Sequence, residues 1–517
     1  MARTAKIRPP FVWLGKHTTA VSLIGTVGVG AFFRFYMLGS LPPGLDAGTA
    51  TVGLQALNLL HNHGLPRFTQ ANDYNILWVF LQAVALKYLG HTALALRVVP
   101  AILGTVAIAT TWLWIRSWFG LRVAWLTAFL LAVTPWAITI SRSGSSAAMW
   151  PALVTLTLWL ATLTWRSGGG LWGLRLAIAL FLCLLAGPVG WLLVLCLAGV
   201  GLDVWLRRKN RPTFRPSALI GVIGMVLVTA IAIYWLSFSR GTLGSFSRLM
   251  SVVTSIPDFL MNLVKTLLMF NVSGDQNYVN NLSGEPLLNA FVGLMLVAGI
   301  LVGFSRLHQR RYRLLFLLTP VMLLPALLTT AGAPNAARAA TALPLVLAIA
   351  AIGISYMLEL WYQTFPINSA ARLTGQFAIF ILLALTLFQG YTQYFRAWAG
   401  SSQVSVSYNQ GAIQMAALLA DAGTYKGQNV IVATPGELPV IAYLDYHGVP
   451  YVAATDAQIL HIPNNPKGHQ FIISAAATDN ATKALKAKFA GGVLYPHYAS
   501  YSPAGDAEIY YTYTVSK

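Results

Sequence analysis

The chain has 517 residues, of which 56% are hydrophobic and only 9% are charged, whereas about a quarter of the residues in a typical soluble domain are charged. This composition excludes an ordinary soluble protein and predicts a polytopic membrane protein. The formal net charge of +20 does not indicate nucleic-acid binding, because the basic residues form short runs between apolar segments and no single basic face.

Ten apolar segments predict eleven crossings of the lipid bilayer. A crossing needs about 20 residues, and the segment 171–206 is long enough to cross twice, with Gly187 and Pro188 marking its turn. The predicted segments are 17–38, 92–115, 122–140, 147–165, 171–206, 216–235, 287–304, 314–330, 341–358 and 373–391. We expect about 11–13 transmembrane helices in all. The apolar stretch 76–90 is too short for a full crossing and is expected to be re-entrant, interfacial or part of a bent hairpin.

The distribution of basic residues predicts the orientation. The N-terminus and the basic runs 207–215 and 306–313 are expected in the cytoplasm. The first apolar segment follows without a small-residue cleavage site, which is typical of a retained anchor. Eleven crossings then place the intervals 41–75 and 236–286, together with the turns around Arg142 and Arg338, on one extracytoplasmic face.

From Phe395 onward the chain changes character, since its basic and acidic residues balance and no window is long enough to span a membrane. Short β-branched and aromatic runs alternate with amphipathic stretches, which predicts a small α/β domain. The expected strands are 429–434, 450–455, 470–474, 491–495 and 508–515, and the expected helices are 406–422, 437–448 and 477–490. We therefore divide the chain into a transmembrane domain, 1–394, and an extracytoplasmic domain, 395–517.

The first long polar interval, 41–75, carries two of the chain's fourteen carboxylates, Asp46 and Asp73. A Pro-Pro-Gly turn at 42–44 delivers Asp46 to the outer face, where a carboxylate could accept a proton during group transfer. Asp46 could equally cap the helix expected to start near Gly48. Asp73 lies in an Asn-Asp-Tyr-Asn stretch, where a turn is the alternative role.

Two arginines, Arg142 and Arg338, lie on the predicted outer face, against the usual charge distribution. A guanidinium binds phosphate oxygens through two parallel donors, so both are candidates for binding a lipid phosphate. The alternative is contact with ordinary lipid head groups. Arg97 lies inside an apolar segment and needs a buried partner.

The loop between 274 and 286 offers groups suited to sugar hydroxyls. Its amide and carboxylate side chains supply donors and acceptors, and its tyrosine supplies a stacking face. The candidates are Asp275, Asn277, Tyr278, Asn281 and Glu285. A structured turn network would use the same residues, and both interpretations stay open.

The sequence does not require a metal ion. Asp46, Asp73, Asp275, Glu285, His61 and His63 could approach one another, but no fixed ligand spacing links them. Whether a divalent cation is needed therefore stays unknown. The two cysteines, Cys183 and Cys196, lie in apolar segments and are expected to be small core residues.

Several stretches resemble the bacterial membrane glycosyltransferases of the GT-C superfamily related to protein O-mannosyltransferases and the lipid A aminoarabinose transferase. They are the PPGL turn with its following amphipathic stretch, residues 81–120, LAVTPWAITISRSG at 131–144, residues 270–288 and APNAARAATALPLV at 333–346. The resemblance implies a multi-span fold with an extracytoplasmic active site. It also implies transfer of a sugar from a polyprenyl-phosphate donor to an envelope lipid, glycan or protein, with inversion of the anomeric carbon.

The chain departs from that family at its usual acidic positions. Gly48 and Thr49 stand where relatives carry an adjacent Asp-Glu pair, and the run 74–77 stands where they tend to show Arg-Glu-Pro-Leu. Asp46 and Asp73 are the nearest acids. The alternative is a catalytically silent relative that binds or scaffolds envelope components, whereas a transporter is disfavoured because no inverted repeat with paired broken helices is visible.

Overall fold

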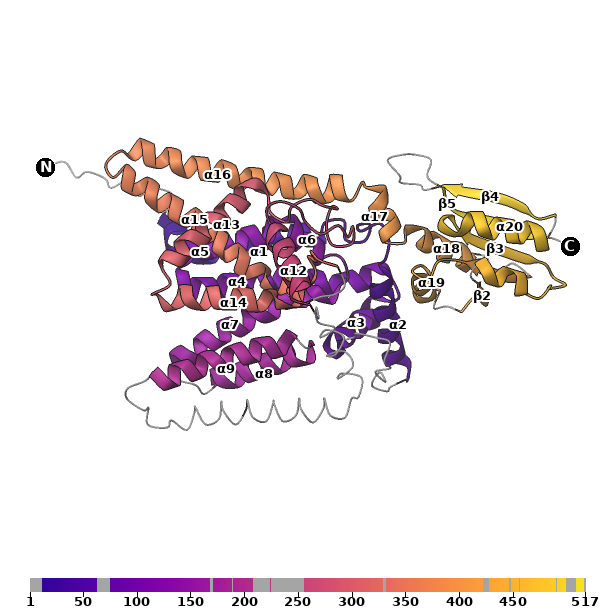
Figure 1. Cartoon of the computed structure of the whole chain (residues 1–517), viewed down its shortest axis with the longest axis horizontal. Helices are drawn as coiled ribbons and strands as arrows, with labels where there is room; N and C mark the ends of the chain where they lie inside the picture. Colours follow the sequence, from indigo (N-terminus) through magenta and orange to yellow (C-terminus); the bar gives the residue numbers. More distant parts are fainter. Residues whose placement is uncertain are drawn as a thin grey trace.

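A bundle of long helices forms most of the protein, and a smaller sheet-containing domain extends from one end of it (Figure 1). The computed structural model describes residues 12–62, 75–167, 171–187, 189–207, 224, 255–328, 332–421, 427–445, 448–454, 456–489, 491–498 and 508–515. Apart from residue 224, the predicted segment 216–235 lies outside the described residues, as does Asp73.

The helices at the centre of the bundle correspond to predicted membrane segments. They are α1 (Val12–Phe35), α4 (Ala93–Phe119), α5 (Leu121–Val133), α7 (Met149–Ser167), α13 (Ala290–Ser305) and α15 (Leu343–Thr364). The α13 and α15 helices pack very closely because Gly299 faces the backbone of Ile349 and Gly353 faces that of Met295. Small residues allow such approach in membranes, where tight packing, and not exclusion of water, drives helix association.

The remaining bundle helices surround this centre. They are α6 (Pro135–Ile140), α8 (Leu171–Leu185), α9 (Val189–Arg207), α12 (Ile256–Leu268), α14 (Arg310–Leu327) and α16 (Ser369–Thr392), which continues as a π-helix at Gln393–Trp398. The predicted break in the segment 171–206 is confirmed between Leu185 and Val189. Segment 122–140 also breaks, because Pro135 lacks the N–H that would continue α5 and starts α6 instead.

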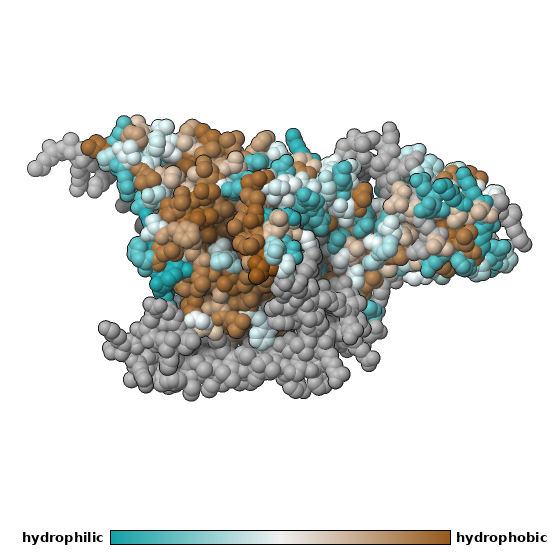
Figure 2. Space-filling model, in the orientation of Figure 1, coloured by the Kyte–Doolittle hydropathy of each residue, from teal (hydrophilic) through white to brown (hydrophobic). Residues whose placement is uncertain are grey.

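Four helical runs in the described part of the chain are long and apolar enough to cross a membrane alone, namely Ala93–Phe119, Ser146–Ser167, Arg338–Thr364 and Ser369–Trp398. Shorter apolar helices accompany them. A broad apolar surface covers the bundle, while the surface of the sheet domain is more mixed and polar (Figure 2). The protein is therefore a mostly helical membrane protein, as its composition predicted.

Two helices, α2 (Ala47–Asn62) and α3 (Ile76–Leu89), pack on each other at the end of the bundle nearest the sheet domain. Asn75 caps α3 by accepting a hydrogen bond from the backbone N–H of Trp78, at 3.3 Å. A helix of 14 residues rises only about 21 Å, less than the ~30 Å of a hydrocarbon core. As predicted for 76–90, α3 is too short to cross the membrane alone.

The C-terminal domain contains a five-stranded mixed sheet in the order β2-β1-β3-β5-β4. Its strands are β1 (Gln428–Val432), β2 (Tyr451–Ala454), β3 (His469–Ser474), β4 (Val493–Tyr498) and β5 (Glu508–Val515), and its helices are α17 (Ser402–Ser407), α18 (Gln410–Asp421), α19 (Leu438–Leu444) and α20 (Thr478–Lys488). Strand β1 pairs in parallel with β2 and β3, and β5 pairs antiparallel to β3 and β4. The predicted strands and the α/β class are thus confirmed.

Side-chain alternation along these strands divides the domain's core in two. Val430 and Phe471 pack with Leu485 of α20 in a separate apolar cluster, whereas the neighbouring Ile431 and Ile472 belong to the same cluster as the bundle core. Successive residues of a strand point to opposite faces of the sheet. One face is therefore covered by α20, and the other continues into the membrane domain through α18 and α19.

Candidate active site

The loop between α1 and α2, residues 36–46, is held by buried guanidinium groups. Arg97, only 2% exposed, donates hydrogen bonds from Nη1 to the carbonyl oxygens of Leu38 and Gly39, at 3.2 and 3.3 Å, and from Nη2 to that of Gly44. One side chain on α4 thus gathers three carbonyls from both ends of the loop. The buried partners expected for Arg97 are therefore backbone carbonyl oxygens.

Arg142 joins the last turn of α1 to the middle of the same loop. It is fully buried, and its Nη1 donates to the carbonyls of Phe33 and Arg34, both at 2.9 Å. Its Nη2 donates to the carbonyl of Leu41 at 3.2 Å, and its Nε donates to the hydroxyl of Tyr394 at 3.0 Å. These contacts give Arg142 a structural role, in contrast to the predicted phosphate contact, because its donors are engaged inside the protein.

Arg34 completes a group of three buried arginines, with Arg97 and Arg142, that we call the arginine clamp. Its guanidinium donates to the carbonyls of Gly30, Leu131 and Ala132 at 3.0–3.2 Å. Within the described residues, none of the three has a carboxylate partner. Because an unpaired buried charge is costly, carbonyl dipoles must compensate these charges. For Arg97 and Arg142 the carbonyls include those of the loop, so these two arginines fix it, whereas Arg34 ties α1 to α5.

Asp46 stands at the end of this loop and caps α2. Its Oδ2 accepts a hydrogen bond from the backbone N–H of Thr49 at 3.2 Å, and its carbonyl accepts one from Ala50 at 3.0 Å. The carboxylate is half-buried. Burial raises the pKa of Asp46, while the nearby backbone N–H groups of Thr49, Gly48 and Ala47 lower it by smaller amounts. A cap with a raised pKa is also a better proton acceptor, so the two roles are compatible.

The C-terminal domain closes over the same loop. Asn409, in the left-handed region at φ 49°, donates from Nδ2 to the carbonyl of Leu45 at 3.0 Å. The backbone of Tyr408 lies so close to Gly44 that a Cβ there would overlap the Tyr408 carbonyl. The two residues before Asp46 are therefore both held in place. Arg97 of the bundle binds the carbonyl of Gly44, and Asn409 of the C-terminal domain binds that of Leu45.

The turn after α6 supports the first residues of α2. The hydroxyl of Thr49 donates to the carbonyl of Ser143 at 3.4 Å, and a Cβ at Gly144 would collide with the Thr49 side chain. Gly144 has φ +81°, a conformation that glycine adopts without strain. The position where relatives carry an acid is thus filled by a buried, packed threonine.

Asp275 links its own loop to the turn before α15. Its Oδ1 accepts from the backbone N–H of Asn277 at 2.9 Å, and its Oδ2 accepts from Nδ2 of Asn280 at 3.1 Å and from the backbone N–H of Ala336 at 2.8 Å. Asp275 is only 4% exposed. The Asp275 carboxylate therefore joins its own loop to the turn that contains Arg338, and its role is structural.

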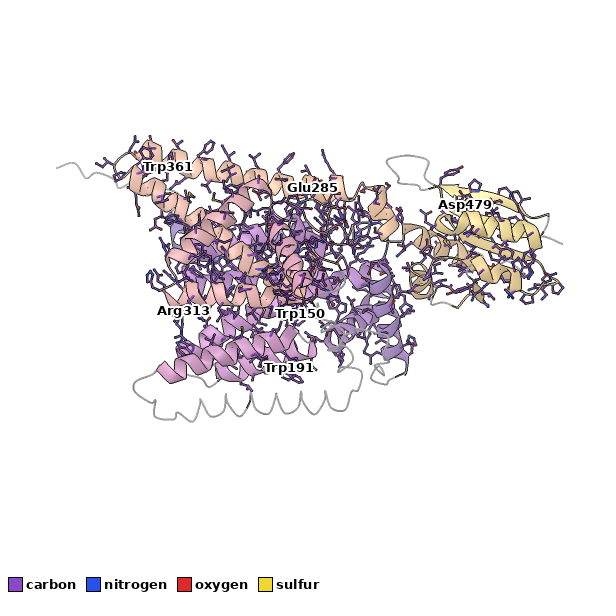
Figure 3. All side chains as sticks on the ribbon, viewed as in Figure 1. Trp150, Trp191, Glu285, Arg313, Trp361 and Asp479 are labelled. Atoms are coloured by element: carbon purple, nitrogen blue, oxygen red, sulfur yellow. The ribbon has the colours of Figure 1, made fainter. Side chains whose placement is uncertain are left out.

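The other candidates in this loop divide between internal and exposed positions. Asn281 is buried and donates from Nδ2 to the carbonyl of Glu285 at 2.6 Å. The carbonyl of Tyr278 accepts from the indole N–H of Trp398 at 2.9 Å. The side chains of Asn277 and Glu285 are exposed, and Glu285 lies at the end of the bundle nearer the sheet domain (Figure 3). The turn network uses Asn281 and also Asn277, whose Oδ1 accepts from the backbone N–H of Val279 at 2.9 Å. Asn277 and Glu285 stay exposed, and Tyr278 is half-buried.

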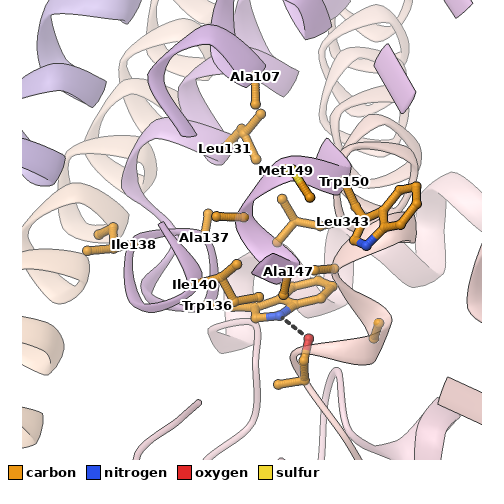
Figure 4. Packing of buried hydrophobic residues seen from close by; sticks show 14 of the residues in the cluster. Ala107, Leu131, Trp136, Ala137, Ile138, Ile140, Ala147, Met149, Trp150 and Leu343 are labelled. Carbon is orange, nitrogen blue, oxygen red and sulfur yellow. Dashed lines mark hydrogen bonds between the residues drawn. The ribbon is translucent and has the colours of Figure 1, made fainter. Parts of the chain in front are cut away.

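Arg338 is half-buried and opens a 3-10 turn, Arg338–Ala342, that leads into α15. The turn is anchored by Asn335, whose Oδ1 accepts from the backbone N–H of Arg338 at 2.9 Å. The indole N–H of Trp136 donates to the carbonyl of Ala336 at 2.9 Å, within an apolar cluster that includes Ile140, Ala147 and Leu343 (Figure 4). Of the two predicted phosphate ligands, Arg338 is the one with an accessible side chain.

The metal requirement and the role of Asp73 stay open. Among the described residues, no group of three His, Cys, Asp or Glu side chains is placed to hold a metal ion, and Asp73 lies outside them. Sequence reasoning missed Tyr408, Asn409 and Arg34 as residues that shape the site. Arg34 had a visible signal, a lone arginine near the end of an apolar segment; the contacts of Tyr408 and Asn409 had none.

Along nearly its whole length the chain has a fold similar to those of two solved membrane proteins, in agreement with the fold that the sequence resemblance implied. ArnT from Cupriavidus metallidurans in the apo state matches with a TM-score of 0.59 at 13% identity, over 97% of this chain and 98% of that chain. The same enzyme bound to undecaprenyl phosphate matches with a TM-score of 0.55 at 14% identity, over 98% of both chains.

A second similar structure is the archaeal oligosaccharyltransferase AglB from Archaeoglobus fulgidus, in complex with an inhibitory peptide and a dolichol-phosphate. It matches with a TM-score of 0.51 at 16% identity, over 98% of this chain and 75% of that chain. No family profile matches the chain, and no curated protein sequence matches it. Identities this low establish the fold, and the activity must be argued from the site.

Proposed function

We propose that this protein is a glycosyltransferase that moves a sugar from a polyprenyl-phosphate donor to an envelope lipid, glycan or protein acceptor, with inversion of the anomeric carbon. The observation that carries the proposal is a GT-C fold along 98% of the chain with a carboxylate, Asp46, presented on a loop that Arg97 and Arg142 hold. Solved ArnT binds undecaprenyl phosphate and solved AglB binds a dolichol-phosphate, which supports the same class of donor here.

In the proposed reaction, Asp46 accepts the proton of the acceptor hydroxyl while that oxygen forms the new bond to the anomeric carbon. The bond from this carbon to the donor phosphate breaks, and its electron pair leaves on the phosphate oxygen. A single displacement of this kind inverts the anomeric carbon. The raised pKa of Asp46 favours proton transfer, since a general base works best when its pKa approaches the working pH.

The departing phosphate needs a cation, and Arg338 is the better candidate of the two predicted arginines. Its planar guanidinium can bind two phosphate oxygens at once, and its side chain is half-buried, whereas Arg142 is fully buried and engaged. The neighbouring loop would present Asn277, Tyr278 and Glu285 to the sugar or acceptor.

We place this site and the C-terminal domain outside the cytoplasm, in a protein of the cell membrane. Figure 3 shows Arg313, from the basic run 306–313, at the end of the bundle away from the sheet domain. Basic residues beside membrane segments favour the cytoplasmic side, so the opposite end with Asp46 would face outward.

The second candidate function is binding or scaffolding without catalysis. The observation that favours it is Thr49, which is 5% exposed and bonded to Ser143 at a position where relatives carry an acid. If Asp46 served only as a cap, the site would retain its shape and its lipid but transfer no sugar.

The test measures release of undecaprenyl phosphate by the full-length protein in lipid nanodiscs, with a panel of undecaprenyl-phosphate sugars and a membrane extract as acceptor. Asp46→Asn should keep the cap, because Asn caps about as well as Asp, and should lower turnover by about 10² or more. Asp479→Asn is the matched control, since Asp479 is exposed in the first turn of α20.

Arg338→Lys should weaken donor use, because it keeps the charge and loses the two-pronged contact. Full turnover in Asp46→Asn would remove Asp46 as the base. Wild-type protein that binds the donors but turns over none of them would favour the silent relative.

A further inference from the structure

The C-terminal domain contains a pocket of about 390 Å³ at one end of its sheet. The starts of β1 and β2 form one wall, with Gln428 and Tyr451, and the loop before β3 forms the other, with Asn464 and Asn465. This volume lies within the range of ~300–1,000 Å³ that is usual for small-molecule sites.

The pocket lies at the end of the sheet away from the Asp46 loop. Strands β1, β2 and β3 are parallel, and the helix after β1, α19, packs against α2, where the hydroxyl of Tyr443 donates to the carbonyl of Thr92 at 3.1 Å. The carboxyl ends of the strands therefore face the bundle, and their amino ends, which form the pocket, face away from it. The pocket is separate from the candidate active site.

The lining carries no charge and mixes polar with apolar groups. Gln428, Tyr451, Asn464 and Asn465 supply the polar groups, and Pro450, Val452, Pro463 and Pro466 supply the apolar ones. No charged side chain lines the pocket, so an ion would find no counter-charge in its walls. In the described part of the chain, the side-chain amides of Gln428 and Asn464 have no hydrogen-bond partner. Tyr451 is half-buried, and burial together with the charge of Asp445 raises the pKa of its phenol. A tyrosine hydroxyl is protonated at neutral pH in any case and can donate a hydrogen bond.

Two prolines and two hydrogen bonds shape the asparagine wall. Asn464 and Asn465 lie between Pro463 and Pro466, whose rings fix their own φ angles. The backbone N–H of Asn465 donates to Nε2 of His469 at 2.9 Å, and its Oδ1 accepts from the backbone N–H of Lys467 at 3.0 Å. Asn465 thus braces the turn, while the side chain of Asn464 is exposed.

We infer that this pocket binds a neutral oligosaccharide of the cell envelope. Sugar hydroxyls both donate and accept hydrogen bonds, as the amides of Gln428 and Asn464 do. The C–H face of a sugar ring packs on an aromatic ring such as that of Tyr451. The inference goes beyond the proposed transfer reaction and does not depend on it, because the pocket holds none of the residues assigned to that reaction.

The experiment measures binding of neutral oligosaccharides to the full-length protein in nanodiscs without any lipid donor, by saturation-transfer NMR and by titration. The panel contains tetramers of β-1,4-linked N-acetylglucosamine, of mannose and of galactose, with a proline-rich peptide of similar size as the other candidate occupant. At least one sugar should bind, and Tyr451→Ala and Asn464→Ala should each weaken its binding about tenfold, the loss expected for one aromatic or hydrogen-bonding contact.

Tyr495→Ala is the matched control, because Tyr495 is a 56% exposed tyrosine on β4, the edge strand at the other side of the sheet from the pocket. The Tyr495→Ala variant should bind the sugar as the wild type does. Asp46→Asn should also bind normally, which separates this inference from the proposed function. Three results would overturn it: no sugar of the panel binds, Tyr495→Ala loses as much as Tyr451→Ala, or the peptide alone occupies the pocket.

Discussion

The arginine clamp predicts that Arg97→Lys will destabilise the protein although it conserves the charge. Arg97 joins the carbonyls of Leu38, Gly39 and Gly44 with two nitrogen atoms of one planar group. A lysine ammonium is a compact charge on a flexible stem and cannot reach carbonyls at both ends of the loop at once.

The expected cost follows from the hydrogen bonds lost. A hydrogen bond from a charged donor contributes about 1.5–3 kcal/mol, so losing one or two of the three gives a decrease of roughly 2–5 kcal/mol in the free energy of unfolding. Arg116 offers the matched control on the same helix. It is exposed, with its guanidinium over the ring of Trp112 at 5.1 Å, and Arg116→Lys should change stability by less than about 0.5 kcal/mol.

The assay is reversible unfolding in mixed detergent micelles by titration with dodecyl sulfate, read by tryptophan fluorescence. Undecaprenyl phosphate release by the same variants reports whether the loop still presents Asp46, and Arg97→Lys should lower it. If Arg97→Lys unfolds at the same dodecyl sulfate fraction as wild type, or if Arg116→Lys loses as much stability, the clamp does not hold the loop.

Two further predictions concern the C-terminal domain. A cysteine at Asp479, which is exposed, should react with an impermeant thiol reagent in intact cells and one at Arg313 only after lysis; the reverse pattern would contradict the proposed orientation. Burial lowers the pKa of His469 and of His497 in the folded protein. As the pH falls, these histidines therefore take up protons first in the unfolded chain, where the pKa of histidine is about 6.5. The stability that they contribute should be complete above that pH and should fall as the pH drops through it. Hydrogen exchange of the β3 amides in the full-length protein, corrected for intrinsic rates, should therefore speed up between pH 7.5 and pH 5, and His469→Gln should reduce this dependence; protection that does not change with pH would contradict it.

The sequence alone determined the class of protein and most of its helices and strands. Membrane segments require only length and hydropathy, so the helices on either side of Gly187 were visible in the residues themselves. The strand at 429–434 follows in the same way from its β-branched run. The local role of Asp46 was also within reach, because a cap involves residues only three positions apart.

Only the tertiary structure decided how the site is held together. Asn409 reaches the carbonyl of Leu45 from 364 positions away, and Arg142 reaches that of Phe33 from 109 positions away. These partners are backbone carbonyls, which every residue possesses, so no residue type in the sequence marks them. A carboxylate partner would have left such a mark, whereas a guanidinium compensated by carbonyl dipoles can be recognised only after the chain has folded around it.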